Sequence, residues 1–132
     1  MMDPLKKQLK PVATYSNPDL QKDQVYSDNR DKSGIYRWTN KINGKFYIGS
    51  AVNLSRRLAY YYSKKHMEST LKKGKSAIYS SIINYGLSNF KLEILEYCSA
   101  ENCIKLEQIY LDFFKPEYNI LKISGSPLGG GG

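Results

Sequence analysis

Cysteine and histidine are scarce in this sequence, which contains two cysteines, Cys98 and Cys103, and one histidine, His66. No second Cys/His pair stands near the cysteines, so neither a zinc site nor a disulfide framework is indicated, and we expect a reduced, intracellular compartment. No apolar run approaches the ~20 residues that a membrane span needs. The N-terminal stretch MMDPLKKQLK also lacks the apolar core of a secretory signal. These absences argue against a secreted, disulfide-stabilised protein and against a membrane protein.

Acidic residues are the minority, and the formal net charge is +8. Residues 1–31 contain five basic and five acidic residues, whereas residues 32–132 contain fifteen basic and seven acidic ones. The excess positive charge therefore lies on residues 32–132, and a domain this basic favours polyanions such as nucleic acid. A charge that only serves solubility is the alternative. Lysine outnumbers arginine 16 to 4, and Ile, Asn and Tyr are plentiful. All are encoded by AT-rich codons, which suggests an organelle genome.

The chain reads as one small domain with two irregular ends. Residues 1–31 lack an apolar period and predict a mobile leader. The stretch SGSPLGGGG predicts a Gly-rich linker or tail over residues 124–132. The folded domain is then expected over residues 32–123.

Apolar periodicity inside this domain predicts an α+β fold of order β-β-α-α-β-α. Three antiparallel strands are expected over residues 35–39, 45–48 and 90–94, the first two joined through the turn signal Asn43-Gly44. About three flanking helices are expected over residues 54–65, 76–85 and 100–114. Asn53 is a typical N-cap for the first helix, Gly86 ends the second and Pro116 stops the third. A Lys-rich loop is expected between the first two helices.

The first two strands place their aromatic residues in a pattern. If their loop has an even number of residues, four side chains share one face of the hairpin: Tyr36, Trp38, Tyr47 and Gly49. The opposite face then carries Ile35, Arg37, Phe46 and Ile48, which we interpret as the core side. Tyr36 and Tyr47 would line a second surface, although tyrosines are also ordinary strand residues.

Two charged residues stand close to apolar positions. Glu107 falls among apolar residues of the last expected helix, where a carboxylate is costly unless it is paired or bound to a metal. The alternative is a glutamate at the rim that reaches water or a lysine. Arg57 flanks the apolar face of the first helix, one turn from Tyr61. Taken alone, Arg57 would be read as a surface arginine.

The most concentrated basic segment lies over residues 56–75 and has tyrosines interleaved with its charges. We interpret it as a track for nucleic-acid phosphates. His66 falls inside this segment and is expected to be solvated rather than catalytic. The residues expected to bind nucleic acid are Arg56, Lys64, Lys65, Lys72, Lys73 and Lys75.

The stretch SGIYRWTNKINGKFYIGSAVNLSRR resembles the signature of the GIY-YIG nuclease superfamily. The resemblance continues with Arg57 ten residues after Tyr47, a helix LEQIYLDFF that contains Glu107, and EYN ending in Asn119. It covers about residues 33–120. Five ordered elements make this match far more specific than a lone GIY.

The resemblance implies hydrolysis of DNA phosphodiester bonds with one divalent ion per site, magnesium or manganese. It makes Glu107 the sole protein ligand of the ion and Arg57 the group that binds the phosphate. One tyrosine would take the proton from the attacking water, with Tyr36 as our choice, and Tyr47 would orient water or phosphate. Arg57 and the ion would favour the phenolate that such a base requires.

Two further positions follow from the resemblance. Asn119 would connect the site by hydrogen bonds. Tyr61 stands where many members carry a histidine, so it either substitutes within the site or the proton relay differs. A histidine-based mechanism is therefore in doubt here.

Within this superfamily, the sequence most resembles the intron-encoded homing endonucleases, which are typical of fungal mitochondria. We therefore expect a mitochondrial, organelle-encoded enzyme that acts on double-stranded DNA. In that group a linker joins the nuclease to a separate DNA-binding module, which these 132 residues do not include. The alternatives are a non-catalytic nucleic-acid-binding module on the same fold, and a repair-type or restriction-type nuclease.

Overall fold

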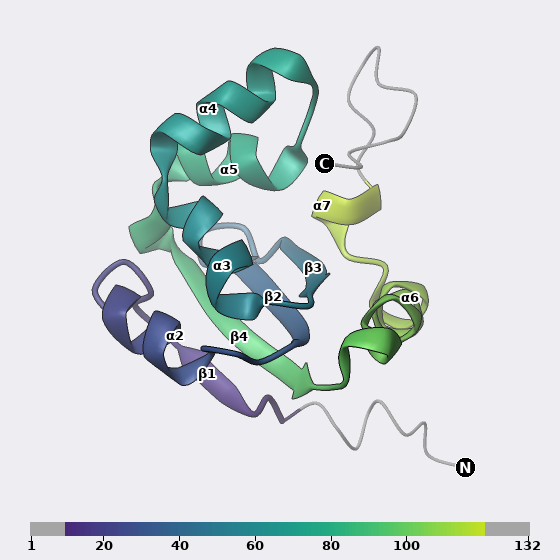
Figure 1. Ribbon diagram of the computed structural model, residues 1–132. Coiled ribbons are helices and arrows are strands. Elements are labelled where there is room, and N and C mark those ends of the chain that lie inside the picture. Colours follow the sequence, from purple (N-terminus) through teal and green to yellow (C-terminus); the bar gives the residue numbers. More distant parts are fainter. Residues whose placement is uncertain (1–9, 121–132) are drawn as a thin grey trace.

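The computed structural model describes residues 10–120, so the expected tail over residues 124–132 lies outside it (Figure 1). The first half of the described chain contains β1 (Ala13–Tyr15), α2 (Lys22–Asp28), β2 (Gly34–Asn40), β3 (Phe46–Ala51) and α3 (Leu54–Ala59). The second half contains α4 (Lys64–Lys73), α5 (Ala77–Tyr85), β4 (Phe90–Tyr97), α6 (Cys103–Phe114) and α7 (Glu117–Ile120). Short 3₁₀ turns lie at Tyr60–Tyr62, Leu87–Asn89 and Ala100–Asn102.

The sheet has four antiparallel strands in the order β1-β4-β2-β3, accompanied by six α-helices in the described residues. The α+β class is as expected, but three strands and about three helices were too few. The fourth strand and the extra helix α2 come from the segment expected to be a mobile leader, and that expectation is wrong for residues 10–31. Tyr15 and Val25 hold this segment, since both are almost fully buried. Isolated anchors of this kind leave no apolar period in the sequence.

The segment after α3 also differs from the expectation. The helix expected over residues 54–65 ends at Ala59 and passes through the 3₁₀ turn at Tyr60–Tyr62. The expected Lys-rich loop is the helix α4, whose N-cap Ser63 accepts a hydrogen bond from the backbone N–H of His66. Met67 is the one side chain of α4 that is fully buried. One apolar contact outweighed the loop-like composition, because tertiary packing overrides weak local preference.

The hairpin register is the one expected from an even loop. Tyr36 pairs with Gly49 and Trp38 pairs with Tyr47, so these four residues share a face. In the turn, the backbone N–H of Gly44 donates to Asn40, and Gly44 has a φ of 77° that only glycine adopts without strain.

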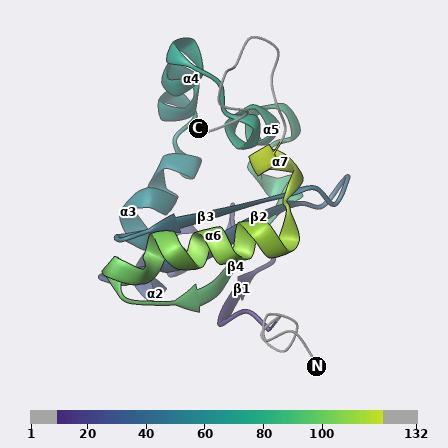
Figure 2. The ribbon, with the colours of Figure 1, turned by 90° about the vertical axis from the view of Figure 1, so that its right-hand side faces the viewer.

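Both faces of the sheet are covered, which corrects the expectation of a single core side (Figures 1 and 2). The tyrosine face carries the larger core, where α3, α4 and α5 pack. Its sheet and helix members include Tyr36, Trp38, Leu54, Leu58, Met67, Ile78 and Ile82. The opposite face carries a smaller cluster beneath α6, formed by Ile35, Ile48, Leu95 and Tyr110.

A buried ion pair and a short helix complete this arrangement. Beneath α6, Arg37 binds the buried carboxylate of Glu93 at 2.9 Å. Helix α7 contacts the outer strand β3 through the side chains of Glu117 and Asn119, which bind its backbone. Within residues 10–120, no helix has the length and apolar character to cross a bilayer.

Candidate active site

The phenol of Tyr36 lies inside the core rather than on a surface. Only 1% of Tyr36 is exposed, and its hydroxyl lies 2.8 Å from the hydroxyl of Tyr61, which is equally enclosed. Gly49, opposite Tyr36 on β3, leaves room for this ring. A Cβ atom at Gly49 would lie 2.5 Å from the hydroxyl oxygen of Tyr36 and 2.6 Å from its Cζ atom. The glycine of the YIG tripeptide is therefore required by the tyrosine of the GIY tripeptide.

Tyr47 is the phenol of the hairpin that reaches open space. It is half-buried and lines a cavity of about 210 Å³ together with Arg57, Tyr61, His66 and Tyr79. Tyr36 does not line this cavity. Its burial argues against Tyr36 as the group that takes a proton from water.

The phenols of the site are poor bases in this environment. Burial raises the pKa of Tyr36 and Tyr61 well above the ordinary value of a phenol. Burial and the charge of Glu107 raise the pKa of Tyr47 to about 12, although Arg57 acts in the opposite direction. The expectation that Arg57 would favour a phenolate has the right sign, but desolvation by the surrounding protein is larger. These phenols therefore carry their protons at neutral pH.

Arg57 is positioned by the junction between β3 and α3. The side chain of Asn53 caps α3 by accepting a hydrogen bond from the backbone N–H of Arg56 at 3.1 Å. Arg57 follows in the first turn and is exposed. Partial burial disfavours its charge, but the neighbouring phenols, Tyr36 and Tyr61 foremost, outweigh this and raise its pKa. The site therefore contains a permanent cation beside neutral phenols.

Glu107 reaches the site from the other side of the sheet. It belongs to α6, is half-buried, and accepts a hydrogen bond from the hydroxyl of Ser50 on β3. Although α6 packs on the face opposite the tyrosines, the charge of Glu107 contributes to the raised pKa of Tyr47. Because β3 is the outermost strand, residues from the two faces meet around its edge.

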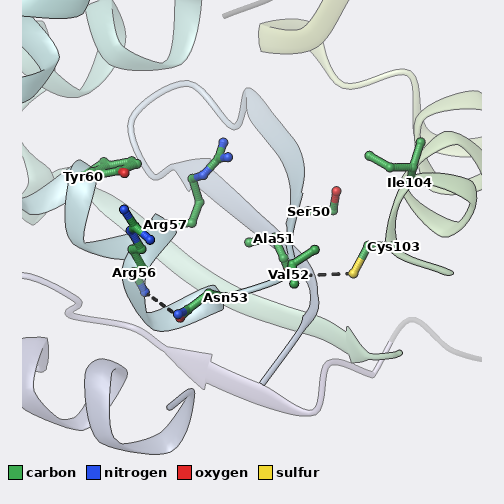
Figure 3. A pocket seen from close by; sticks show the side chains of 9 residues that line it. All are labelled: Ser50, Ala51, Val52, Asn53, Arg56, Arg57, Tyr60, Cys103 and Ile104. Carbon is green, nitrogen blue, oxygen red and sulfur yellow. Dashed lines mark hydrogen bonds between the residues drawn. The ribbon is translucent and has the colours of Figure 1, made fainter. Parts of the chain in front are cut away.

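A cavity of about 340 Å³ lies at this edge (Figure 3). Figure 3 shows Arg56, Arg57 and Tyr60 on one side, Cys103 and Ile104 of α6 on the other, and Ser50 between them. Ser50 thus connects the cavity wall to the carboxylate of Glu107. The cavity is large enough for a phosphate group with an ion and its waters.

The donor set fits a hard divalent cation. Ion pairs in residues 10–120 involve only Arg37, Lys91 and Glu93, so Glu107 has no basic partner there. A half-buried carboxylate without a counter-charge is costly, and a cation would relieve that cost. The same residues contain no cluster of three His, Cys, Asp or Glu side chains. One carboxylate beside an open cavity suits magnesium, which keeps several waters and binds substrate phosphates.

Asn119 acts on the backbone of β3 rather than inside a cavity. Its carbonyl oxygen accepts from the N–H of Ile48 at 2.9 Å, and its amide donates to the carbonyl of Ile48 at 2.8 Å. These two bonds pair the backbone N–H and C=O of Ile48, between Tyr47 and Gly49 on the outer edge of β3, as a further strand would. The expected role of connecting the site by hydrogen bonds stays a prediction, because both of these bonds go to the backbone of Ile48.

His66 lies at the candidate site, although its Lys-rich surroundings in the sequence predict a solvated position. It lies on α4, stacks on Tyr60 with ring centroids 4.2 Å apart, and lines the same cavity as Tyr47 and Arg57. The expectation of a solvated loop position failed because α4 was not foreseen. Ser63, an N-cap residue three positions earlier, was the available signal.

The residues expected to bind nucleic acid are all exposed. Arg56 lines the cavity at the edge of β3, whereas the lysines lie on α4 or just after it: Lys64, Lys65, Lys72, Lys73 and Lys75. Their contact with nucleic acid stays a prediction.

Comparisons with known proteins agree with this architecture. The chain is 34% identical over 131 residues to the probable intron-encoded endonuclease 1 of Neurospora crassa, across 90% of this chain and 40% of that protein. It is 31% identical over 97 residues to the UvrABC system protein C of Bacteroides fragilis, across 74% of this chain and 14% of that protein. The chain thus spans less than half the length of these curated relatives.

A solved structure and a family model complete the comparison. A mutant form of the catalytic domain of intron endonuclease I-TevI superposes with a TM-score of 0.53 at 26% identity, over 67% of this chain and 89% of that domain. The model of the GIY-YIG catalytic domain matches residues 32–119. This range contains the hairpin, Arg57, Glu107 and Asn119. The chain therefore belongs to the GIY-YIG family and is an endonuclease domain of that family.

Proposed function

We propose that this domain hydrolyses phosphodiester bonds of double-stranded DNA with one divalent ion, as the catalytic part of an intron-encoded homing endonuclease. The observation that carries the proposal is the meeting of Arg57, Tyr47 and Glu107 around the edge of β3. The three residues come from α3, β3 and α6. Arg57 and Tyr47 line one cavity, and Arg57 and Ser50 line the next. The hydroxyl of Ser50 donates a hydrogen bond to Glu107. A basic surface that only bound nucleic acid would not need the carboxylate.

Arg57 binds the scissile phosphate in this proposal. Its guanidinium is planar and can direct two N–H groups at two phosphate oxygens. It lines both the cavity shared with Tyr47 and the cavity at the edge of β3. A phosphate held there lies between the phenol of Tyr47 and the side of the site that carries Glu107.

The tyrosines act as neutral hydrogen-bonding groups. Tyr47 orients the attacking water or a phosphate oxygen, since its hydroxyl reaches the cavity and keeps its proton. Tyr36, which we expected to take the proton, supports the site from within the core through its bond to Tyr61. His66 takes the proton instead, because its imidazole lines the same cavity as Tyr47 and Arg57 and has a ring nitrogen that can act as a general base.

Glu107 would hold the divalent ion, with the hydroxyl of Ser50 fixing one carboxylate oxygen. A magnesium ion bound there supplies positive charge opposite the phosphate and the leaving oxygen. Because Ser50 binds one carboxylate oxygen of Glu107, the other would be available to hold the ion. Manganese, which prefers similar oxygen donors, would serve in the same position.

The wider role rests on the relatives. Two of them, both from Neurospora crassa, are named probable intron-encoded endonucleases. The AT-rich codon bias of the composition fits an organelle gene, so we place the protein in mitochondria. Because this chain spans less than half of those proteins, we assign target-site selection to a separate DNA-binding module.

A plasmid-nicking assay tests the function. Supercoiled plasmid is incubated with magnesium and either the wild type, Glu107→Gln, or Glu101→Gln as the control, because Glu101 is exposed and lines neither cavity. The glutamine keeps an acceptor for Ser50 but removes the charge. We expect wild-type rates for the control and a loss of at least about 100-fold for Glu107→Gln. DNA binding is measured in parallel by fluorescence anisotropy.

Two outcomes would contradict the proposal. Equal cutting by Glu107→Gln and wild type would show that the metal site is misassigned. Binding without cutting by all three proteins would favour the non-catalytic binding module. The relatives named UvrABC system protein C give a second candidate, a repair nuclease. Cutting confined to damaged plasmid would favour that candidate.

A further inference from the structure

Three of the four arginines of the chain lie along one surface. Arg37 is engaged beneath α6 with Glu93. The other three, Arg30, Arg56 and Arg57, are exposed, and none forms an ion pair with a residue in the range 10–120. In a sequence that uses lysine for most of its positive charge, this concentration of arginine indicates a requirement for planar, bidentate recognition.

These arginines line a path of three adjoining cavities, each of which shares lining residues with the next. The cavity of Tyr47 and the cavity at the edge of β3 share Arg57 and Tyr60. The cavity at the edge of β3 in turn shares Arg56 and Asn53 with a third cavity, of about 330 Å³. We call this path the arginine groove. Its third cavity is completed by Tyr26, Arg30, Asp31, Ser55 and Ala59.

Arg30 comes from the N-terminal segment, which lies outside the range matched by the family model. The neighbouring residue Asn29 is fully buried and fixes this segment. Its amide nitrogen donates to the carbonyl of Val25 at 2.8 Å, and its carbonyl oxygen accepts from the hydroxyl of Tyr97 at 2.9 Å. Arg30 therefore extends from a backbone that is held in place.

Two further bonds join this segment to α3. The hydroxyl of Ser55 donates to the carbonyl of Tyr26 at 3.2 Å, and the N–H of Leu54 donates to the carbonyl of Lys32 at 2.9 Å. They hold the backbone that carries Arg30 against the backbone that carries Arg56 without any ligand. Such pre-organisation lowers the entropy cost of binding a repeated anion.

We propose that Arg56 and Arg30 bind neighbouring backbone phosphates of the DNA strand whose scissile phosphate is held by Arg57. The inference rests on the proposed function, since it takes the Arg57 end of the groove as the reaction site. A DNA backbone presents one negative charge per nucleotide at a regular spacing, and the groove presents its arginines one after another. Asp31 is the one acid lining the third cavity, so the local charge there stays positive.

This assignment gives the N-terminal segment a role in binding. The segment β1–α2 extends the nuclease fold by one strand and one helix and carries a phosphate contact to the far end of the groove. The lysines of α4 lie beyond the opposite end, near His66. The strand therefore runs across α3 from the α4 side towards α2.

Equilibrium binding tests the proposal on the full chain. A fluorescent 20-base-pair duplex is titrated by anisotropy with calcium in place of magnesium, at four salt concentrations, for wild type, Arg30→Gln and Arg56→Gln. The control is Lys105→Gln, which removes one charge from an exposed position on α6 that lines no cavity of the groove. Thermal unfolding of each variant verifies that the fold is kept.

Each arginine variant should bind several-fold more weakly than wild type, and its slope of log K against log salt should fall by about 0.9, the value for one lost phosphate contact. Lys105→Gln should stay within about twofold of wild type in affinity. An Arg30→Gln variant that matches Lys105→Gln in both affinity and slope would overturn the proposal, even if nicking still depends on Glu107. If wild type fails to nick while Arg30→Gln still weakens binding, the phosphate contacts of the arginine groove are supported and the proposed nuclease function is contradicted.

Discussion

The hydroxyl groups of Tyr36 and Tyr61 lie 2.8 Å apart, and at most 3% of either residue is exposed. Each phenol is the hydrogen-bond partner that the other needs, because an unpaired hydroxyl in the core would be costly. Tyr61 stands where many family members have a histidine. In this chain that position supports Tyr36 structurally, and the histidine of the site comes from α4.

Removing one hydroxyl of this pair should destabilise the fold. Tyr61→Phe preserves the ring but leaves the hydroxyl of Tyr36 unpaired, so we expect a loss of about 1–2 kcal/mol in the free energy of unfolding. Urea denaturation measures the change, with Tyr60→Phe as the control. The double variant Tyr36→Phe/Tyr61→Phe should lose less than the sum of the single variants. Strictly additive losses would show that the two hydroxyls do not depend on each other.

A side chain at position 49 should disturb the site through Tyr36. In Gly49→Ala the new Cβ would overlap the hydroxyl and Cζ of Tyr36, so the ring or β3 must shift. We expect a loss of about 1–3 kcal/mol in the free energy of unfolding, together with reduced nicking. Gly74→Ala is the control, because that glycine has extended backbone and no atom within 4 Å of a Cβ. Similar melting temperatures for the two variants would contradict this packing.

Alkaline pH should destabilise the protein through its buried phenols. The folded-state pKa of Tyr47 is raised to about 12, from an ordinary value near 10 in the unfolded chain. The stability that this shift represents is complete below pH 10 and is lost as the pH rises from 10 towards 12. Urea unfolding at pH 8, 10 and 11 should show a steady decline. Tyr47→Phe should decline less steeply, and equal slopes for the two proteins would contradict the assignment.

The assignment of His66 to proton transfer predicts a loss of nicking without a loss of binding. We expect His66→Gln to lower the nicking rate about 10–100-fold while it binds the duplex as tightly as wild type. The ring of His66 stacks on that of Tyr60 with centroids 4.2 Å apart, so His66→Phe keeps a ring for this contact but has no basic nitrogen. It should lose as much nicking activity as His66→Gln. A wild-type rate for His66→Phe would mean that His66 only packs against Tyr60.

Local signals determined the central hairpin and the helix α5. The Asn43-Gly44 turn and the alternation of β-forming residues specify the register that pairs Tyr36 with Gly49, because a slip of one residue would reverse every side chain. Ser76 and Gly86 mark the ends of α5 in the same direct way. These features depend on residues within one turn or strand of each other, so the sequence alone specifies them.

Long-range packing decided the rest of the molecule and the site. The N-terminal segment folds because Tyr15 and Val25 enter a core built elsewhere, and α4 forms because Met67 does the same. Glu107 binds Ser50 of β3, the outer strand, and this position of β3 follows from a strand order that no local pattern encodes. The sequence by itself determined the face on which each hairpin residue lies, and it named Arg57 and Glu107 as candidate site residues. The tertiary structure alone decided that they meet, because that depends on contacts between segments far apart in the chain.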